Sequence, residues 1–185
     1  HPKIRMPGPF GHEVVGRVAE LGEGLTGWRI GERVVALHTS PCGKCPPCER
    51  GQTNLCEHFE DRINLGAFSE RLAVPPGITR SYALRVPEAV PTRRALFLQS
   101  LACVEHGLER ARPAAGENVL VQGTGCLGLL LSLSARLKGA RVTLAGRRPA
   151  RRRIARELGF EAVEVAAEGQ AQLPAAYGPR GGTGG

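Results

Sequence analysis

The chain has 185 residues, enough for one large domain or two small ones with a substantial hydrophobic core, which excludes a miniprotein held together by disulfides. Its 25 lysines and arginines against 17 acidic residues give a formal net charge of +8, which by itself favours nucleic acid or an anionic membrane as a partner. Aromatic residues make up only 4% of the chain, too few for a surface that stacks exposed bases.

The positive charge is concentrated in one segment. Residues 141–156 contain seven arginines and no acidic residue, whereas the rest of the chain has nearly balanced charge. This pattern indicates one local anion site, so we expect neither nucleic acid nor a membrane as partner. The longest uncharged run, residues 118–135, contains three glycines and is a poor candidate for a membrane span. No secretory signal pattern opens the chain, which predicts a cytoplasmic protein.

Residues 1–90 are predicted to form an all-β domain. Short β-like runs at residues 14–19, 33–37 and 68–74 alternate with Gly and Pro, as in a barrel or a sandwich. From Thr92 onward the spacing of apolar residues becomes helical, which places a domain boundary near residue 90.

Residues 91–170 have the pattern of the first half of a doubly wound parallel sheet. Apolar strands at 119–121, 142–145 and 162–165 alternate with two helical segments, in the order strand, helix, strand, helix, strand. Residues 171–185 are rich in glycine and are predicted to be a loose tail. The predicted fold class is therefore α/β with an additional all-β domain.

Four cysteines lie within 15 residues in the pattern C-x2-C-x2-C-x7-C: Cys42, Cys45, Cys48 and Cys56. Such close spacing curls the chain around one ion, and four thiolates favour tetrahedral Zn²⁺ in a closed, structural site, here the loop 42–56. The alternatives are two disulfides, which the absence of a secretory segment disfavours, and an iron–sulfur cluster, which the spacing disfavours. Cys103 and Cys126 are interpreted as small buried hydrophobic residues.

A glycine motif follows the strand at 119–121. Residues 123–128 read G-x-G-x-x-G between a predicted strand and a predicted helix, the context expected of a dinucleotide-binding turn. Gly123 permits the tight turn, Gly125 lets the backbone approach a pyrophosphate, and Gly128 lets the helix pack closely on the strand. The alternative is a tight strand-to-helix turn that binds nothing.

The end of the next strand distinguishes between two cofactors. Proteins that bind NAD carry an acidic residue there, about 20 residues after the glycine motif, which binds the ribose 2′-hydroxyl. Here Gly146 takes that position and Arg147 can form paired hydrogen bonds with a 2′-phosphate, with Arg148 as a second candidate. The sequence therefore favours NADP(H) over NAD(H). The alternative, a solvated helix face, is expected for most of the arginines that follow: Arg151, Arg152, Arg153 and Arg156.

The segment Gly11-His12-Glu13-Val14-Val15-Gly16 opens the first β-like run. By itself, a histidine beside a glutamate is more often a surface pair than a metal site. In combination with the cysteine cluster and the glycine turn that follow it, the motif resembles the zinc-dependent medium-chain alcohol dehydrogenases. The connecting segments Gly31-Glu32-Arg33-Val34, Gly66-Ala67-Phe68-Ser69-Glu70 and Leu101-Ala102 to His106-Gly107 extend the resemblance over residues 4–166.

The resemblance implies a GroES-like β barrel, a Rossmann domain and a catalytic zinc that polarises an alcohol or carbonyl oxygen while hydride passes to or from nicotinamide. The family's motif histidine, a zinc ligand, falls on His12, and its neighbouring carboxylate, a zinc ligand or a partner of one, falls on Glu13. The first ligand of the family, a cysteine further upstream, has no counterpart in the ten residues before Gly11. The third ligand position falls near Gln99, whose neutral amide is a weak zinc ligand.

The leading hypothesis is a zinc-dependent alcohol or polyol dehydrogenase that prefers NADP(H) and acts on a small alcohol or carbonyl compound. The chain would be an inactive fragment of it that lacks both ends. The alternative is a truncated relic that keeps the structural zinc and part of the nucleotide site but catalyses nothing. A basic zinc module that binds nucleic acid ranks far below, because the charge lies outside the cysteine loop. The resemblance also implies that the full-length enzyme is a homo-oligomer.

Overall fold

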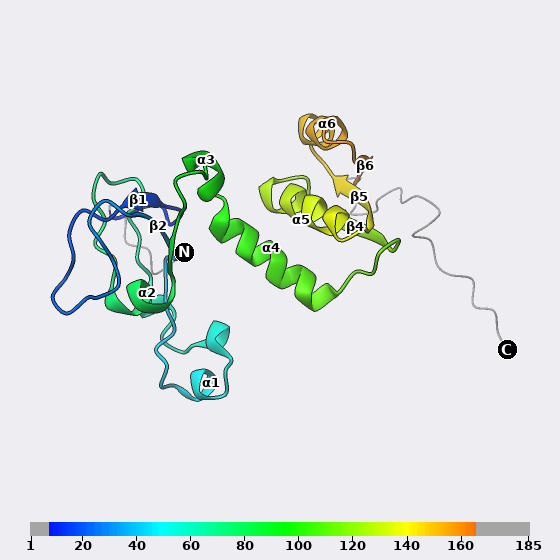
Figure 1. The fold of residues 1–185 in the computed structure, drawn as a ribbon. Coiled ribbons are helices and arrows are strands. Elements are labelled where there is room, and N and C mark those ends of the chain that lie inside the picture. Colours follow the sequence, from blue (N-terminus) through cyan, green and yellow to red (C-terminus); the bar gives the residue numbers. More distant parts are fainter. Residues whose placement is uncertain (1–7, 166–185) are drawn as a thin grey trace. The chain divides into compact units, whose positions relative to one another are not determined.

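The computed structural model of the chain describes residues 8–165 (Figure 1). These residues fall into two compact units that divide between Gln99 and Ser100. The glycine-rich tail predicted at 171–185 lies outside the described residues.

The first unit is built on a small antiparallel sheet. The strands β1 (Val15–Arg17), β2 (Arg33–Ala36) and β3 (Ala83–Arg85) pair in that order, with β2 in the centre. Val35 on β2 packs with Val86 and Ala95 in a buried cluster. Short helical segments occupy the connections: α1 (Pro46–Glu49), η1 (Thr53–Leu55), η2 (Glu60–Arg62), α2 (Pro76–Ser81) and α3 (Thr92–Ala95). Within residues 8–99 the sheet is open and not the closed barrel that was predicted, because three short strands are too few to close on themselves.

The prediction of a strand at residues 68–74 is wrong, because the structure has no strand there. Ser69 Oγ lies 2.6 Å from the carbonyl oxygens of both Gly66 and Arg71, which share its one hydroxyl hydrogen, and the Ser69 N–H donates to the Gly66 carbonyl oxygen at 2.9 Å, so the chain is held in a turn. Such bonds from serine to nearby backbone compete with sheet pairing. Phe68 is 82% exposed and stacks on Phe10, so the apolar residues of this run do not mark a buried face.

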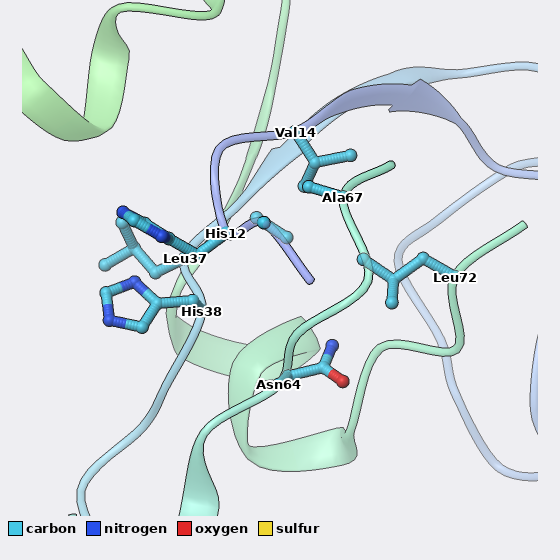
Figure 2. Close-up of a pocket in the computed structure, with 9 residues that line it drawn as sticks. His12, Val14, Leu37, His38, Asn64, Ala67 and Leu72 are labelled. Atoms are coloured by element: carbon cyan, nitrogen blue, oxygen red, sulfur yellow. The ribbon is translucent and has the colours of Figure 1, made fainter. Parts of the chain in front are cut away.

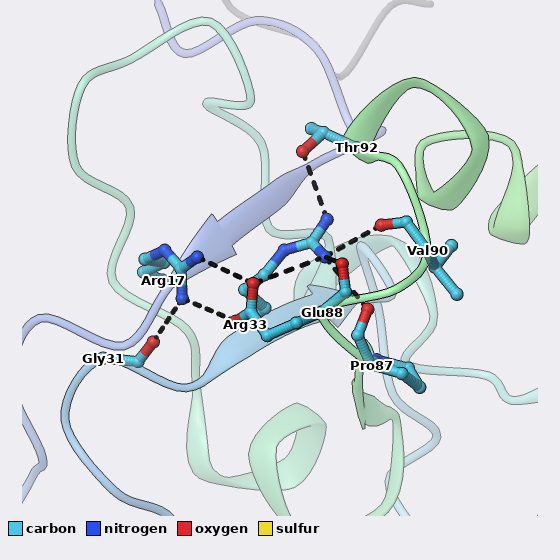
Figure 3. A network of polar contacts seen from close by, with 7 residues as sticks. All are labelled: Arg17, Gly31, Arg33, Pro87, Glu88, Val90 and Thr92. Carbon is cyan, nitrogen blue, oxygen red and sulfur yellow. Dashed lines mark hydrogen bonds and ion pairs between the residues drawn. The ribbon is translucent and has the colours of Figure 1, made fainter.

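A buried arginine ties the sheet to the segment after it (Figure 3). Arg33 on β2 is only 8% exposed. Its Nη1 donates to the carbonyl oxygens of Pro87 and Val90 at 3.0 and 2.8 Å, and its Nη2 donates to Thr92 Oγ1 at 3.1 Å. A guanidinium is stable in a buried position only where its donors are used, so Arg33 fixes the path of the chain between β3 and α3.

The second unit contains a parallel sheet of three strands in the order β4-β5-β6. The strands are β4 (Asn118–Gln122), β5 (Arg141–Gly146) and β6 (Glu161–Glu164), and the helices are α4 (Leu98–Ala111), α5 (Cys126–Leu137) and α6 (Pro149–Glu157). Helix α5 connects β4 to β5, and α6 connects β5 to β6 (Figure 1). This arrangement confirms the predicted partial doubly wound sheet.

Two apolar clusters hold the second unit together. Leu144 on the central strand β5 is fully buried with Val121, Ala155 and Phe160. A neighbouring cluster contains side chains of α4 and α5. The uncharged run at residues 118–135 is divided between β4, the glycine turn and α5, and none of the helices within residues 8–165 is long and apolar enough to cross a bilayer.

We predict that Arg33→Met lowers the free energy of unfolding by about 2–4 kcal/mol, because the buried guanidinium and its partly buried hydrogen bonds to three acceptors are lost. The matched control is Arg17→Met. Arg17 is exposed and pairs with Glu88 at 2.9 Å, where its hydrogen bond lowers the pKa of the Glu88 carboxyl group. Solvent screens this exposed pair, so its loss should cost much less in urea-unfolding measurements. Equal losses in the two variants would contradict the role given to Arg33.

Candidate functional site

The cysteine loop folds four thiols toward one point. Cys42 precedes α1, Cys45 caps its N-terminus, Cys48 lies within it, and Cys56 follows η1. Two prolines in the first turn of α1 suit positions where a helix needs no N–H donor. The four sulfur atoms lie within 4.8 Å of one another, and three of the four side chains are buried. The structure therefore brings together all four predicted zinc ligands of the loop.

The spacing of these sulfur atoms fits one tetrahedral zinc ion. Four ligands at about 2.3 Å from zinc are about 3.8 Å apart, close to the 4.0 Å between the sulfur atoms of Cys45 and Cys56. A disulfide would bring two sulfur atoms to about 2.05 Å, whereas all four cysteines here are free thiols. Because sulfur would fill all four coordination positions, zinc in this loop would stabilise the fold and leave no open position for chemistry.

Backbone donors and burial act on these thiols in opposite directions. The Lys44 N–H donates to Cys42 Sγ at 3.5 Å and is the main cause that lowers the pKa of the Cys42 thiol to about 6. Burial raises the pKa of the Cys48 thiol to about 12. The thiolate is the form that binds zinc, so zinc binding would have to displace the proton of Cys48.

The histidine motif is held in place by a close backbone approach. Gly11 has a φ of +82°, and a Cβ atom at this position would lie 2.6 Å from the ring of Phe68. The Gly11 carbonyl oxygen accepts hydrogen bonds from the N–H groups of Gly66 and Ala67 at 3.0 and 3.3 Å. Two of the segments that carry the family resemblance therefore pack on each other and fix the position of His12.

His12 lies beside a second histidine that the sequence analysis missed (Figure 2). The ring centroids of His12 and His38 are 4.9 Å apart. Burial lowers the pKa of His38, and the charge of His12 lowers it further. The buried Nδ1 of His38 has no hydrogen-bond partner among residues 8–165. The adjacent cavity has a volume of about 10 Å³, about the space of one water molecule, and is too small for a substrate.

The residues around His12 do not make a complete catalytic zinc site. Such a site needs three protein ligands. Within residues 8–165, the four-cysteine cluster is the only group of three or more histidine, cysteine or carboxylate side chains placed to share an ion. The exposed His12 and Glu13 belong to no such group. His12 and Glu13 therefore stay predicted ligands, and residues 8–165 place no third ligand beside them.

The turn between β4 and α5 approaches β5 closely. Gly123, with a φ of +120°, donates its N–H to the Ala145 carbonyl oxygen at 2.8 Å. A Cβ atom on Gly128 would lie 1.9 Å from the Gly123 carbonyl oxygen, so α5 can take this position only with glycine there. An anion beside Gly125 would meet the first N–H groups of α5, which have no partner within the helix.

A pocket of about 490 Å³ lies between this turn and the end of β5. It has the size of an ordinary small-molecule site. Five of the predicted cofactor residues line it: Gly123, Gly125, Gly146, Arg147 and Arg148. Gly128 is not among the lining residues. The guanidinium of Arg151, which the sequence analysis assigned to a solvated helix face, also lines the pocket, and a Cβ atom on Gly125 would lie 3.5 Å from its Nη1.

The interpretation of Arg152 as a solvated residue is wrong. Arg152 is 7% exposed, and its Nη1 donates to the carbonyl oxygens of Gly146 and Arg147 at 2.9 and 2.8 Å. Its Nη2 lies 3.0 Å from Glu164 Oε2. Arg156 likewise donates to the Ala162 carbonyl oxygen at 2.7 Å. These two arginines bind the end of β5 and the strand β6, whereas Arg147, Arg148 and Arg151 remain available to a ligand.

The missed residues differ in the signal that could have identified them. Arg151 lies in the first turn of α6, three residues after the N-cap residue Arg148, so its place at the predicted start of this helix contained the information. His38 required the strand register. Because Val15 pairs with Val35 in the antiparallel sheet, extending the register three residues past β1 places His12 opposite His38.

Both remaining cysteines are exposed, contrary to the prediction that they are buried. Cys103 lies outside the buried face of α4, which contains Val104 and Leu108. Cys126 is the first residue of α5.

Comparisons with known proteins bear on both units. Residues 1–87 match the family described as "Alcohol dehydrogenase GroES-like domain". The chain is 32% identical over 163 residues to a 2-dehydro-3-deoxy-L-galactonate 5-dehydrogenase from Pseudoalteromonas atlantica, covering 87% of this chain and 47% of that protein. It is 36% identical over 148 residues to a sorbitol dehydrogenase from Halalkalibacterium halodurans, covering 79% of this chain and 42% of that protein.

A solved structure extends the similarity to the fold. A protein from Sinorhizobium meliloti 1021, crystallised with NADP bound, is 34% identical, with a TM-score of 0.76 over 87% of this chain and 46% of that one. The predicted combination of a GroES-like domain with a partial parallel sheet is confirmed. The chain spans about half the length of the curated relatives it matches.

We predict that the purified chain binds one zinc ion and that Cys45→Ser abolishes stoichiometric binding, because three sulfur ligands leave the tetrahedral site open. Metal analysis after dialysis measures the zinc content, and thermal unfolding measures the accompanying loss of stability. Cys103→Ser, which removes an exposed thiol outside the loop, is the matched control and should retain the zinc. Retention of a full equivalent by Cys45→Ser would contradict the assignment of the loop.

Proposed function

Because this chain belongs to the zinc-dependent medium-chain alcohol dehydrogenase family, we propose that the whole protein transfers hydride between a polyol or sugar-derived alcohol and a nicotinamide cofactor, with NADP(H) preferred over NAD(H). The substrate class is supported by the names of two relatives, a 2-dehydro-3-deoxy-L-galactonate 5-dehydrogenase and a sorbitol dehydrogenase. The cofactor preference is supported by residues of this chain.

The observation that carries the cofactor proposal is the composition of the pocket at the end of β5. Gly146 stands where NAD-binding proteins carry a carboxylate, so no negative charge at this position repels a phosphate. Arg147, Arg148 and Arg151 line the same pocket. A guanidinium can donate two parallel hydrogen bonds to phosphate oxygens, which favours a cofactor with a 2′-phosphate over one with a 2′-hydroxyl.

The chain's own residues would bind the adenosine end of the cofactor. The Gly123–Gly125 turn lets the backbone approach the pyrophosphate, and the N-terminus of α5 follows directly after it. Arg147, with Arg148 as second candidate, would hold the 2′-phosphate. When bound, the nicotinamide would accept or donate the hydride. The zinc loop would stabilise the first unit and take no part in the reaction.

The second candidate function is binding alone: the protein would bind structural zinc and a nucleotide but catalyse no reaction. It is supported by the position of His12 and Glu13 outside any group of three metal-ligating side chains within residues 8–165. We expect no NADPH-dependent aldehyde reduction by the purified 185-residue chain. Measurable turnover together with two zinc ions per chain would decide for the enzyme and against this candidate.

We predict that the unmutated chain binds NADP⁺ more tightly than NAD⁺ and that Arg147→Asp reverses this order. Replacing the guanidinium by a carboxylate removes the phosphate contacts and adds repulsion, so NADP⁺ affinity should fall at least about tenfold. Isothermal titration with both cofactors at one fixed salt concentration measures the change.

The matched control for this experiment is Arg153→Asp. It makes the same change of charge on α6 at an exposed residue that pairs with Glu157 at 3.7 Å and does not line the pocket. Its effect on NADP⁺ affinity should be small, because solvent screens exposed charges outside the site. Equal affinities of the unmutated chain for NADP⁺ and NAD⁺ would remove the basis of the proposed preference.

A further inference from the structure

Gly146 has no room for a side chain, and Thr124 is the reason. A Cβ atom built on Gly146 would lie 2.4 Å from Thr124 Oγ1 and 2.6 Å from Thr124 Cγ2. Carbon atoms in favourable contact are about 3.5–4.0 Å apart, so both atoms would overlap strongly with any residue larger than glycine. The side chain of Thr124 therefore occupies the volume through which an acidic side chain at position 146 would have to leave the backbone.

Rotation of the Thr124 side chain relieves this overlap only in part. Thr124 is 5% exposed and is β-branched, so its side chain has few conformations available in this turn. Its own Cβ atom would still lie 3.1 Å from a Cβ atom on Gly146, and rotation about χ1 does not move that atom.

The two backbone segments are also held together. On one side, the Gly123 N–H donates to the Ala145 carbonyl oxygen, and the contact between Gly123 and Gly128 blocks movement of the turn toward α5. On the other side, the buried Arg152 holds the carbonyl oxygens of Gly146 and Arg147. Separating the segments to admit a side chain would break these hydrogen bonds in a buried region.

We propose that Thr124 is a residue that determines cofactor specificity. By filling the volume beside Gly146, it excludes the carboxylate that would bind a ribose 2′-hydroxyl and leaves the pocket to the arginines. The inference rests on the proposed preference for NADP(H) and adds a mechanism to it. The NADP(H) preference then depends on the pair Thr124 and Gly146, as well as on the positive charge of the arginines that line the pocket.

The steric part is tested without any cofactor by thermal unfolding of the full chain. Gly146→Ala should lower the Tm by about 3–10 °C, because an added methyl group overpacks a buried contact. In a Thr124→Ala background the same substitution should lower it by less than half as much. In a Thr124→Val background, which keeps the volume of the side chain, the full loss should remain. Gly107→Ala is the control, since a Cβ there meets no atom of the described part of the chain within 4 Å, and it should cause no loss.

The specificity part is tested by titration with NAD⁺. Gly146→Asp alone should gain little NAD⁺ affinity, because the carboxylate cannot take its place beside Thr124. Gly146→Asp combined with Thr124→Ala should bind NAD⁺ at least about tenfold more tightly than Gly146→Asp alone. Equal gains in the single and the double variant would overturn the role of Thr124.

The two measurements separate a failure of this inference from a failure of the proposed function. If the unmutated chain binds NADP⁺ and NAD⁺ with equal affinity, both the proposed NADP(H) preference and the specificity role of Thr124 are wrong. The Tm measurements then show whether the contact between Thr124 and Gly146 matters for stability alone. If the chain prefers NADP⁺ but Gly146→Ala costs the same with Thr124 as with Ala at position 124, the preference stands and the role of Thr124 is overturned.

Discussion

The pocket at the end of β5 depends on one constraint, the close approach of the glycine turn to that strand. A single backbone hydrogen bond joins Gly123 to Ala145, and the glycines at 128 and 146 leave no space for a Cβ atom on either side of the contact. Because the turn and the strand end are fixed in this way, the residues that follow Gly146 emerge directly at the mouth of the pocket. The same constraint limits which side chains fit at position 146, the position from which NAD-binding proteins contact the ribose.

The concentration of arginines after residue 140 combines two kinds of residue that look alike in the sequence. Arg152 and Arg156 are structural, because their donors bind backbone oxygens of neighbouring segments. Arg147, Arg148 and Arg151 are exposed and line the pocket. The basic segment is therefore partly structural, and three of its arginines line the pocket at the end of β5.

The parts of the structure that were predicted correctly are those whose information is local. The four cysteines whose sulfur atoms cluster lie close together in the chain, and the strands and helices of the second unit follow from the period of their apolar residues. Several of the wrong or missing predictions concern partners that strand register or local hydrogen bonding brings together. Arg152 meets Glu164 and His12 meets His38 only after the strands have paired, and Ser69 changes a β-like run into a turn through hydrogen bonds that hydrophobic alternation does not reveal.

The four-cysteine loop and the pocket at the end of β5 belong to separate units, and only the pocket bears on the proposed choice of cofactor. The most direct measurement compares two small ligands, adenosine 2′,5′-bisphosphate and adenosine 5′-monophosphate, which differ only in the 2′-phosphate. We expect the bisphosphate to bind the unmutated chain at least about tenfold more tightly, with a difference that shrinks as salt concentration rises. Equal affinities for the two ligands would contradict a 2′-phosphate site at the end of β5.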